Sequence, residues 1–211
     1  MNTGVLGLFK FGQQSHIEEF CKLGRLFMKP LWKFRRLEAD ELRGDCTEGV
    51  HWTFPSDQVK LQMEVEGEFR DIPGISGPIR YSRDADRNVN IFCMYALRRE
   101  NPQLLIGPRN FAFGDAYALL MDGDDFLSRV RRALLPQGQE LRWQLVDYVN
   151  PRTHAGPMGI FSKFTHFQYQ SEFRVALLPG TGEDFLFDIG DLSDITTTGK
   201  LSDVNDHIKV E

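Results

Sequence analysis

Runs of apolar residues, and their alternation with polar residues, predict several β-strands. Residues 59–65 place an apolar side chain at every second position, which predicts a strand with one wet face. Residues 89–97 are almost continuously apolar, so we expect a central strand that is buried on both faces. The other predicted strands cover residues 5–11, 26–28, 141–149 and 167–177.

Apolar residues at helical spacing predict a smaller number of helices. Residues 15–18 have the Ser-x-x-Glu pattern of a capping box, and Gly24 is expected to end the helix that follows. A short helix is expected over residues 31–37. Asp124 or Asp125 is expected to cap a later helix. The apolar positions of that helix are Phe126, Val130 and Leu134.

The order of these elements predicts an α+β fold. Strands outnumber helices and do not alternate with them, which favours a mixed, largely antiparallel sheet with flanking helices. The chain has 211 residues, enough for one sizeable core and marginal for two. We therefore expect a single domain over residues 1–211, with a loosely packed tail after about residue 190, where Asp, Thr and Ser are frequent.

Composition and charge narrow the class of protein. The formal net charge is -5, so bulk attraction to nucleic acid or to an anionic membrane is not expected. The three Cys residues are far apart and form no C-x-x-C, which fits a reducing compartment and predicts a cytoplasmic protein. No run of about 18 apolar residues occurs, and neither a basic segment nor a cleavage site accompanies the first strand, so we expect neither a membrane span nor a signal peptide.

The predicted strand at residues 167–177 carries the best candidate chemistry. Alternation places Gln170, Glu172 and Arg174 on its polar face, while the opposite face is apolar and fixes the register. Such a strand holds a catalytic carboxylate rigidly, and Arg174 can pair with Glu172 and keep it ionised. The alternative interpretation is a solvated polar face with weak cross-strand pairs, or a purely structural salt bridge.

Gln170-Ser171-Glu172 resembles the Q-x-E motif on the catalytic strand of some ADP-ribosyltransferases. The chain also resembles a broader set of uncharacterised bacterial proteins, some of them near phage-defence genes. The motifs of this second resemblance are Phe9-Lys10-Phe11, Gly24-Arg25-Leu26-Phe27, the GD…EG segment at residues 44–49, and a late strand with Lys163, Phe167, Gln170, Glu172 and Arg174.

The resemblance implies an ADP-ribosyltransferase-like fold and an effector, a toxin or phage-defence protein, that uses NAD as a substrate and a protein or nucleic acid as acceptor. Glu172 would hold the nicotinamide ribose and stabilise an oxocarbenium-like state, Gln170 would orient the acceptor, and Arg174 would support Glu172. The first strand carries Lys10 where the family classes have Arg or His, and a Ser-Thr-Ser strand is absent. The residues that clamp NAD in those classes therefore do not carry over.

A segment rich in cations and aromatic rings follows the first strand. Its members are Lys22, Arg25, Lys29, Lys33, Arg35 and Arg36, interleaved with Phe20, Phe27, Trp32 and Phe34. This mixture suits phosphates and stacked bases, although snorkelling cations on an amphipathic surface have the same pattern. Together with Lys10, we expect Arg25, Phe27 and Arg36 to contact the dinucleotide. The alternative function is a non-enzymatic binding module of a mobile element, which binds protein or nucleic acid through this patch.

Other chemistry has little support in the sequence. The acidic residues Glu38, Asp40, Glu41, Asp45 and Glu48 are a cation-binding candidate, but a polar loop explains them better. The His residues have no metal-ligand spacing, and no metal is expected. Serine-hydrolase, Rossmann and P-loop motifs are absent.

Overall fold

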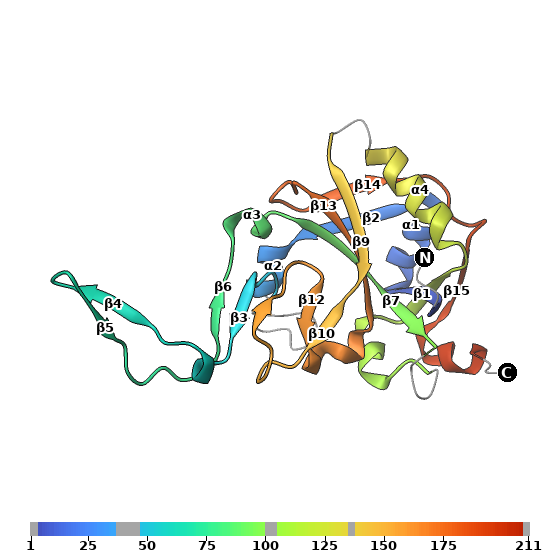
Figure 1. Cartoon of the computed structure of the whole chain (residues 1–211). Coiled ribbons are helices and arrows are strands. Elements are labelled where there is room, and N and C mark those ends of the chain that lie inside the picture. Colours follow the sequence, from blue (N-terminus) through green and yellow to red (C-terminus); the bar gives the residue numbers. More distant parts are fainter. Residues whose placement is uncertain (1–3, 37–46, 100–104, 135–137, 209–211) are drawn as a thin grey trace.

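The computed structural model describes residues 4–36, 47–99, 105–134 and 138–208. It has α+β architecture, with a large, mainly antiparallel sheet and few helices, as the sequence predicted (Figure 1). The strands of this sheet are β1 (Val5–Gly12), β2 (Arg25–Pro30), β7 (Asn90–Arg98), β8 (Ala116–Leu120), β9 (Glu140–Leu145), β13 (Glu172–Leu178), β14 (Phe185–Asp188) and β15 (Thr196–Lys200).

Strand β7 is the centre of the sheet, as its continuous apolar sequence predicted. One edge of β7 pairs with β13, and β9 continues the sheet beyond β13. The opposite edge of β7 is shared, because β2 pairs with Asn90 and Ile91 while β1 pairs with residues from Tyr95 onward. No strand among the described residues pairs with residues 92–94 on that edge, so the sheet splits there between β1 and β2.

Helices α1 (Gln14–Leu23) and α4 (Gly123–Leu134) cover one face of the sheet and enclose the main core. The predicted residues Phe126, Val130 and Leu134 are buried in that core. Gly24 ends α1 as predicted, since its φ of 59° lies in the left-handed region that glycine adopts most easily.

Both predicted helix caps are wrong. The structure places the N-cap of α1 at Gln13, and the exposed N–H of Gln14 donates to the Asp115 carboxylate at 2.8 Å. In α4 the capping residue is Asp122, whose Oδ1 accepts from the Asp125 N–H at 2.9 Å. At α1, Asp115 thus takes the place of the predicted capping box. At α4, Asp122 takes the place of Asp124 or Asp125.

The opposite face of the sheet is covered by short elements. They are α2 (Leu31–Arg36), the parallel pair β10 (Asp147–Val149) and β12 (Ser162–Phe164), and the 3-10 helices Pro108–Phe113, Thr165–Gln170 and Leu201–His207. The segment after Gly190 was expected to pack loosely, and this prediction is wrong. Strand β15 pairs with β8, and Leu192, Leu201 and Val204 are buried, because apolar residues are spaced among the polar ones.

The predicted strand at residues 167–177 is only partly correct. Residues 165–170 form a 3-10 helix, Ser171 has a positive φ of 40°, and the strand begins at Glu172. Ser171 Oγ donates to the Ala96 carbonyl at 2.7 Å, which holds the break in place. The predicted strand at residues 141–149 is likewise divided into β9 and β10.

A second, smaller part of the structure lies beside the main sheet. It contains the three-stranded sheet β11 (Gly156–Pro157), β3 (Trp52–Phe54) and β6 (Ile79–Tyr81), the 3-10 turn Ser56–Gln58 and helix α3 (Asp84–Arg87). The hairpin of β4 (Gln62–Val65) and β5 (Glu68–Asp71) extends away from this sheet (Figure 1). The prediction of a strand with one buried face at residues 59–65 is therefore wrong, since β4 is largely exposed on both faces.

Candidate functional site

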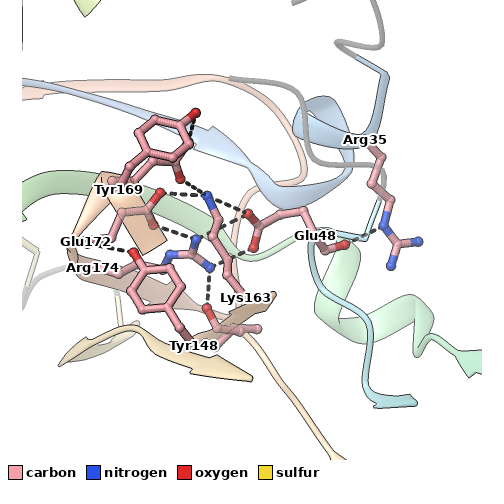
Figure 2. A network of polar contacts seen from close by, with 9 residues as sticks. Arg35, Glu48, Tyr148, Lys163, Tyr169, Glu172 and Arg174 are labelled. Carbon is pink, nitrogen blue, oxygen red and sulfur yellow. Dashed lines mark hydrogen bonds and ion pairs between the residues drawn. The ribbon is translucent and has the colours of Figure 1, made fainter. Parts of the chain in front are cut away.

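Four charged side chains meet on the sheet face opposite α1 and α4: Glu48, Lys163, Glu172 and Arg174 (Figure 2). Lys163 Nζ lies 2.6 Å from Glu172 Oε1 and 3.5 Å from Glu48 Oε2. Arg174 contacts both Glu48 oxygens, at 2.7 Å and 3.2 Å, and Glu172 Oε2 at 2.8 Å. Two anions and two cations make this charge cluster neutral.

The charge cluster combines side chains from three separate segments of the chain. Glu172 and Arg174 alternate with core residues on β13, which is why both point to the polar face. Lys163 lies on β12, which pairs with β10 in a separate two-stranded sheet. Glu48 belongs to a turn far away in sequence, and Arg35 of α2 holds that turn by donating to the Glu48 carbonyl oxygen. The cluster therefore forms only when the whole fold is assembled.

Burial makes the charges of the cluster strongly interdependent. The side chains of Arg174 and Glu48 are 0% and 1% exposed. Burial alone would raise the pKa of Glu172, but the Lys163 and Arg174 charges lower it to about 2, so the carboxylate is ionised at neutral pH. Burial alone would lower the pKa of Lys163, but the Glu172 and Glu48 carboxylates hold it above its ordinary value.

Neighbouring polar groups fix the geometry of Glu172 further. Lys163 Nζ also donates to Gln170 Oε1 at 2.7 Å, so the Gln and the Glu of the Q-x-E motif share one lysine. The Glu172 N–H donates to the Tyr148 hydroxyl at 2.9 Å. Burial and the Glu172 charge raise the pKa of Tyr148 above its ordinary value, so its hydroxyl stays neutral.

The charge cluster lies at the wall of a cavity of about 620 Å³, a size typical of small-molecule sites. The cavity reaches the split between β1 and β2. There the Lys10 ammonium donates to the Cys93 carbonyl at 3.0 Å and lies 4.3 Å from the centroid of the Phe92 ring. The split thus opens the sheet at residues 92–94 of β7, which pair with β13 on one edge but with no described strand on the other.

The cavity brings together most of the residues that the sequence singled out. It is lined by Glu172, Gln170, Arg174, Lys10, Arg25 and Phe27. The side chain of Arg36, the other expected dinucleotide contact, lies outside the part of the structure that is described. Residues 25, 27 and 29 alternate with buried residues on β2, so this strand presents a cation, a ring and a cation toward the cavity.

Three cations of the basic and aromatic segment, Lys22, Arg25 and Lys33, are paired with acids. Arg25 pairs with Asp188 at 2.9 Å, and Lys33 pairs with Asp184 at 3.0 Å. Lys29 makes no ion pair with a described residue and lies 5.4 Å from the centroid of the Phe27 ring. The segment is thus a mixed-charge surface with one basic edge at the cavity.

The sequence did not assign Glu48, Lys163 and Tyr148 to the site. Glu48 was interpreted as part of a polar loop, and it is instead a buried partner of Arg174. Its neighbours Glu38, Asp40, Glu41 and Asp45 lie outside the described residues. The pairing of Glu48 with Arg174 joins positions 126 residues apart, and no local pattern encodes such a contact.

Within the described parts of the chain, no group of His, Cys, Asp or Glu is arranged to hold a metal ion. Among the helices of those parts, none is both long and apolar enough to cross a membrane. Comparison with protein-family models, with curated proteins and with solved structures gave no match.

Proposed function

We propose that the cavity binds NAD and that the protein transfers ADP-ribose from it, with Glu172 as the catalytic carboxylate. One observation carries the proposal: Glu172 is ionised, rigidly held, and at the wall of a cavity large enough for a nucleotide. The role of a toxin or phage-defence effector rests on the resemblance of the sequence motifs alone.

The proposed reaction breaks the bond between nicotinamide and ribose. The bonding electron pair leaves with nicotinamide, positive charge develops on the ribose, and an acceptor nucleophile then attacks that carbon and loses its proton. A fixed carboxylate stabilises this charge where it develops, without reorganisation during the reaction. Glu172 is suited to this because its neighbours on β13 are packed in the core and fix its position.

The ion pairs of Glu172 are compatible with this role. An ionised carboxylate has about four acceptor sites, and here Oε1 accepts from Lys163 while Oε2 accepts from Arg174. A ribose hydroxyl can therefore donate to the carboxylate while both cations stay in place. Glu48 matters as well, because without it the two cations would outweigh the one carboxylate and oppose a positively charged sugar.

The wall formed by β2 supports binding of the dinucleotide. Arg25 and Lys29 flank Phe27, so phosphate oxygens and a base can contact neighbouring side chains of one strand. Gln170 lies beside Glu172 on the shared lysine, where it can orient an acceptor. The alternative of a non-enzymatic binding module has less support, because Lys33 of its basic patch is paired with Asp184 and Arg35 donates to the Glu48 carbonyl.

Calorimetry and a turnover assay test the proposal. NAD is expected to bind the wild-type protein, and release of nicotinamide, measured by chromatography, is expected to follow. Glu172→Gln removes the charge but keeps the size, so binding should persist while release falls by about a hundredfold or more. Phe27→Ala, at a half-exposed position, should instead weaken binding.

Two results would contradict the proposal: no binding of NAD to the wild-type protein, or unchanged nicotinamide release by Glu172→Gln. Circular dichroism and thermal unfolding of Glu172→Gln show whether a loss of release reflects unfolding. Glu140→Gln is the matched control, because Glu140 pairs with Arg142 on the exposed surface of β9 and should release nicotinamide at the wild-type rate.

A further inference from the structure

The hairpin of β4 and β5, with its flanking residues 59–61 and 72, is an arm that projects from the body of the protein (Figure 1). Its turn residues Glu66 and Gly67 both have positive φ, at 54° and 83°, as in the tight turns typical of hairpins. The arm is joined to the rest of the chain at its two ends. An isolated two-stranded hairpin is only marginally stable in water. The arm would therefore be stabilised by a surface on which it could pack.

The two faces of the arm differ. Directly paired residues of β4 and β5 share a face, and Met63 is paired with Arg70. The Ile72 N–H donates to the Leu61 carbonyl at 2.9 Å, which continues the same register and places both on the Met63 face. The apolar side chains of this face are 36% (Leu61), 57% (Met63) and 42% (Ile72) exposed. The sequence therefore encodes an apolar face that the single chain leaves in water.

A second exposed apolar surface lies on the small sheet from which the arm grows. Trp52 of β3 is paired with Tyr81 on one side and with Pro157 on the other, so the three side chains form a row across the sheet. Trp52 and Tyr81 are 36% and 59% exposed, and Trp52 stacks on Phe54 at 5.7 Å between ring centroids. We call this row the Trp52 patch.

The net charges of the arm and of the patch's surroundings have opposite sign. The arm has four carboxylates, Glu64, Glu66, Glu68 and Asp71, against two cations, Lys60 and Arg70. Glu68 and Arg70 share the Met63 face, so the negative excess of the arm lies at its turn and on its other face. Arg83 follows Tyr81 closely, is exposed, and makes no ion pair with a described residue. The nearby acid Asp84 is already paired with Arg87. The acidic arm thus fits the Trp52 patch better than it fits nucleic acid or an anionic membrane.

The arm is connected directly to the two strands that carry the patch, β3 and β6, and it does not fold back onto them. The arm leaves from the end of β3 and returns into β6, and it points away from the sheet that carries the patch (Figure 1). A second copy can present its own patch to the arm. A two-fold axis then makes the contact twice, which closes the assembly and doubles the buried area.

We propose that two copies of this chain form a dimer by exchanging arms, the Met63 face of each arm packing on the Trp52 patch of the other copy. This interface uses none of the four side chains of the charge cluster and does not depend on the proposed reaction.

Sedimentation velocity over a concentration series, with light scattering for the mass, tests the proposal. The wild-type protein is expected to dimerise. Met63→Lys and Tyr81→Lys should each raise the dissociation constant about tenfold or more, because each removes apolar burial and places an ammonium group where it must lose water in the interface. Both sites are exposed, so the melting temperature of the monomer should stay unchanged.

Phe69→Lys is the matched control. Phe69 is 69% exposed but is paired with Glu64, on the face of the arm opposite Met63, so its replacement should leave the dimer intact. A wild-type monomer at every concentration would overturn the proposal, and so would an unaffected dimer in Met63→Lys. Equal weakening by Phe69→Lys would overturn the choice of face. A dimer that survives Tyr81→Lys would overturn the choice of the Trp52 patch.

Discussion

Replacing Glu48 by Ala is expected to destabilise the fold more than any exposed carboxylate replacement. The Glu48 side chain is 1% exposed, and it contacts Arg174 at 2.7 Å and Lys163 at 3.5 Å. Without it, two buried cations face the single carboxylate of Glu172, and the cluster carries an uncompensated positive charge. Breaking a buried ion pair in this way costs about 3–5 kcal/mol.

The expected loss translates into a measurable shift. For a chain of this size, 1 kcal/mol corresponds to roughly 2–4 °C, so Glu48→Ala should lower the melting temperature by about 10 °C. Urea unfolding measures the free energy directly. Glu140→Ala is the control, because Glu140 and Arg142 form an exposed pair whose loss should cost less than about 1 kcal/mol.

A double-mutant cycle separates charge from packing. Arg174→Met added to Glu48→Ala leaves Glu172 and Lys163 as a neutral pair, so the double variant should lose less stability than the sum of the single losses. A deficit of about 2 kcal/mol is a reasonable expectation for groups in direct contact. Strictly additive losses, or a Glu48→Ala loss no larger than that of Glu140→Ala, would refute the reasoning.

Three further predictions follow from individual groups. The pKa of Glu172 is lowered from 4.5 to about 2 in the fold, so its ionised form stabilises the protein above pH 4.5. Up to about 3 kcal/mol of this stability is lost as the pH falls from 4.5 to about 2. Urea unfolding at several pH values should show a smaller loss of stability for Glu172→Gln. Gly24→Ala should cost more than about 2 kcal/mol, because a Cβ there would lie 2.3 Å from the Gly190 oxygen at a φ of 59°, whereas Gly67→Ala, with a φ of 83° and open space around it, should cost only about 1 kcal/mol in thermal unfolding. Burial and the Glu172 charge raise the pKa of Cys93 to about 12, so at mildly alkaline pH its alkylation, followed by mass spectrometry, should be much slower in the native than in the denatured protein.

The sequence predicted those elements whose packing agrees with their local pattern. Strand β7 is apolar on both faces and became the centre of the sheet, and Gly24 ended α1 because its backbone needs a positive φ. The alternation of Glu172 and Arg174 with core residues was also predicted, since Phe173, Val175 and Leu177 fill the core behind them.

The failures occurred where a distant contact decides the local structure. Phe167 and Tyr169 alternate like strand residues, but they lie in a 3-10 helix. The Ser171 hydroxyl donates to the Ala96 carbonyl, and the strand begins only after Ser171. The α1 cap comes from Asp115, and the partner of Arg174 comes from Glu48. A single sequence carries no periodic signal for such pairs. Only the two members of the charge cluster on β13, Glu172 and Arg174, could therefore be predicted.

The apolar alternation at residues 59–65 is the opposite case. The pattern was identified correctly as a strand, but the burial that it implies is absent from the single chain, where Met63 is 57% exposed. The predicted burial and the observed exposure of these residues agree only if another surface covers the arm. The disagreement between sequence and structure is therefore itself the reason to expect the second copy.

The charge cluster invites a similar argument. Buried ion pairs add little net stability, because desolvation offsets the attraction, and apolar side chains of equal volume often do as well. Apolar side chains could fill this part of the interior in place of Glu48, Lys163, Glu172 and Arg174. Their arrangement makes physical sense if an ionised carboxylate must be kept ready at the cavity wall, because only the surrounding charges hold the pKa of a buried Glu172 low. In that case the cluster serves the cavity rather than the fold.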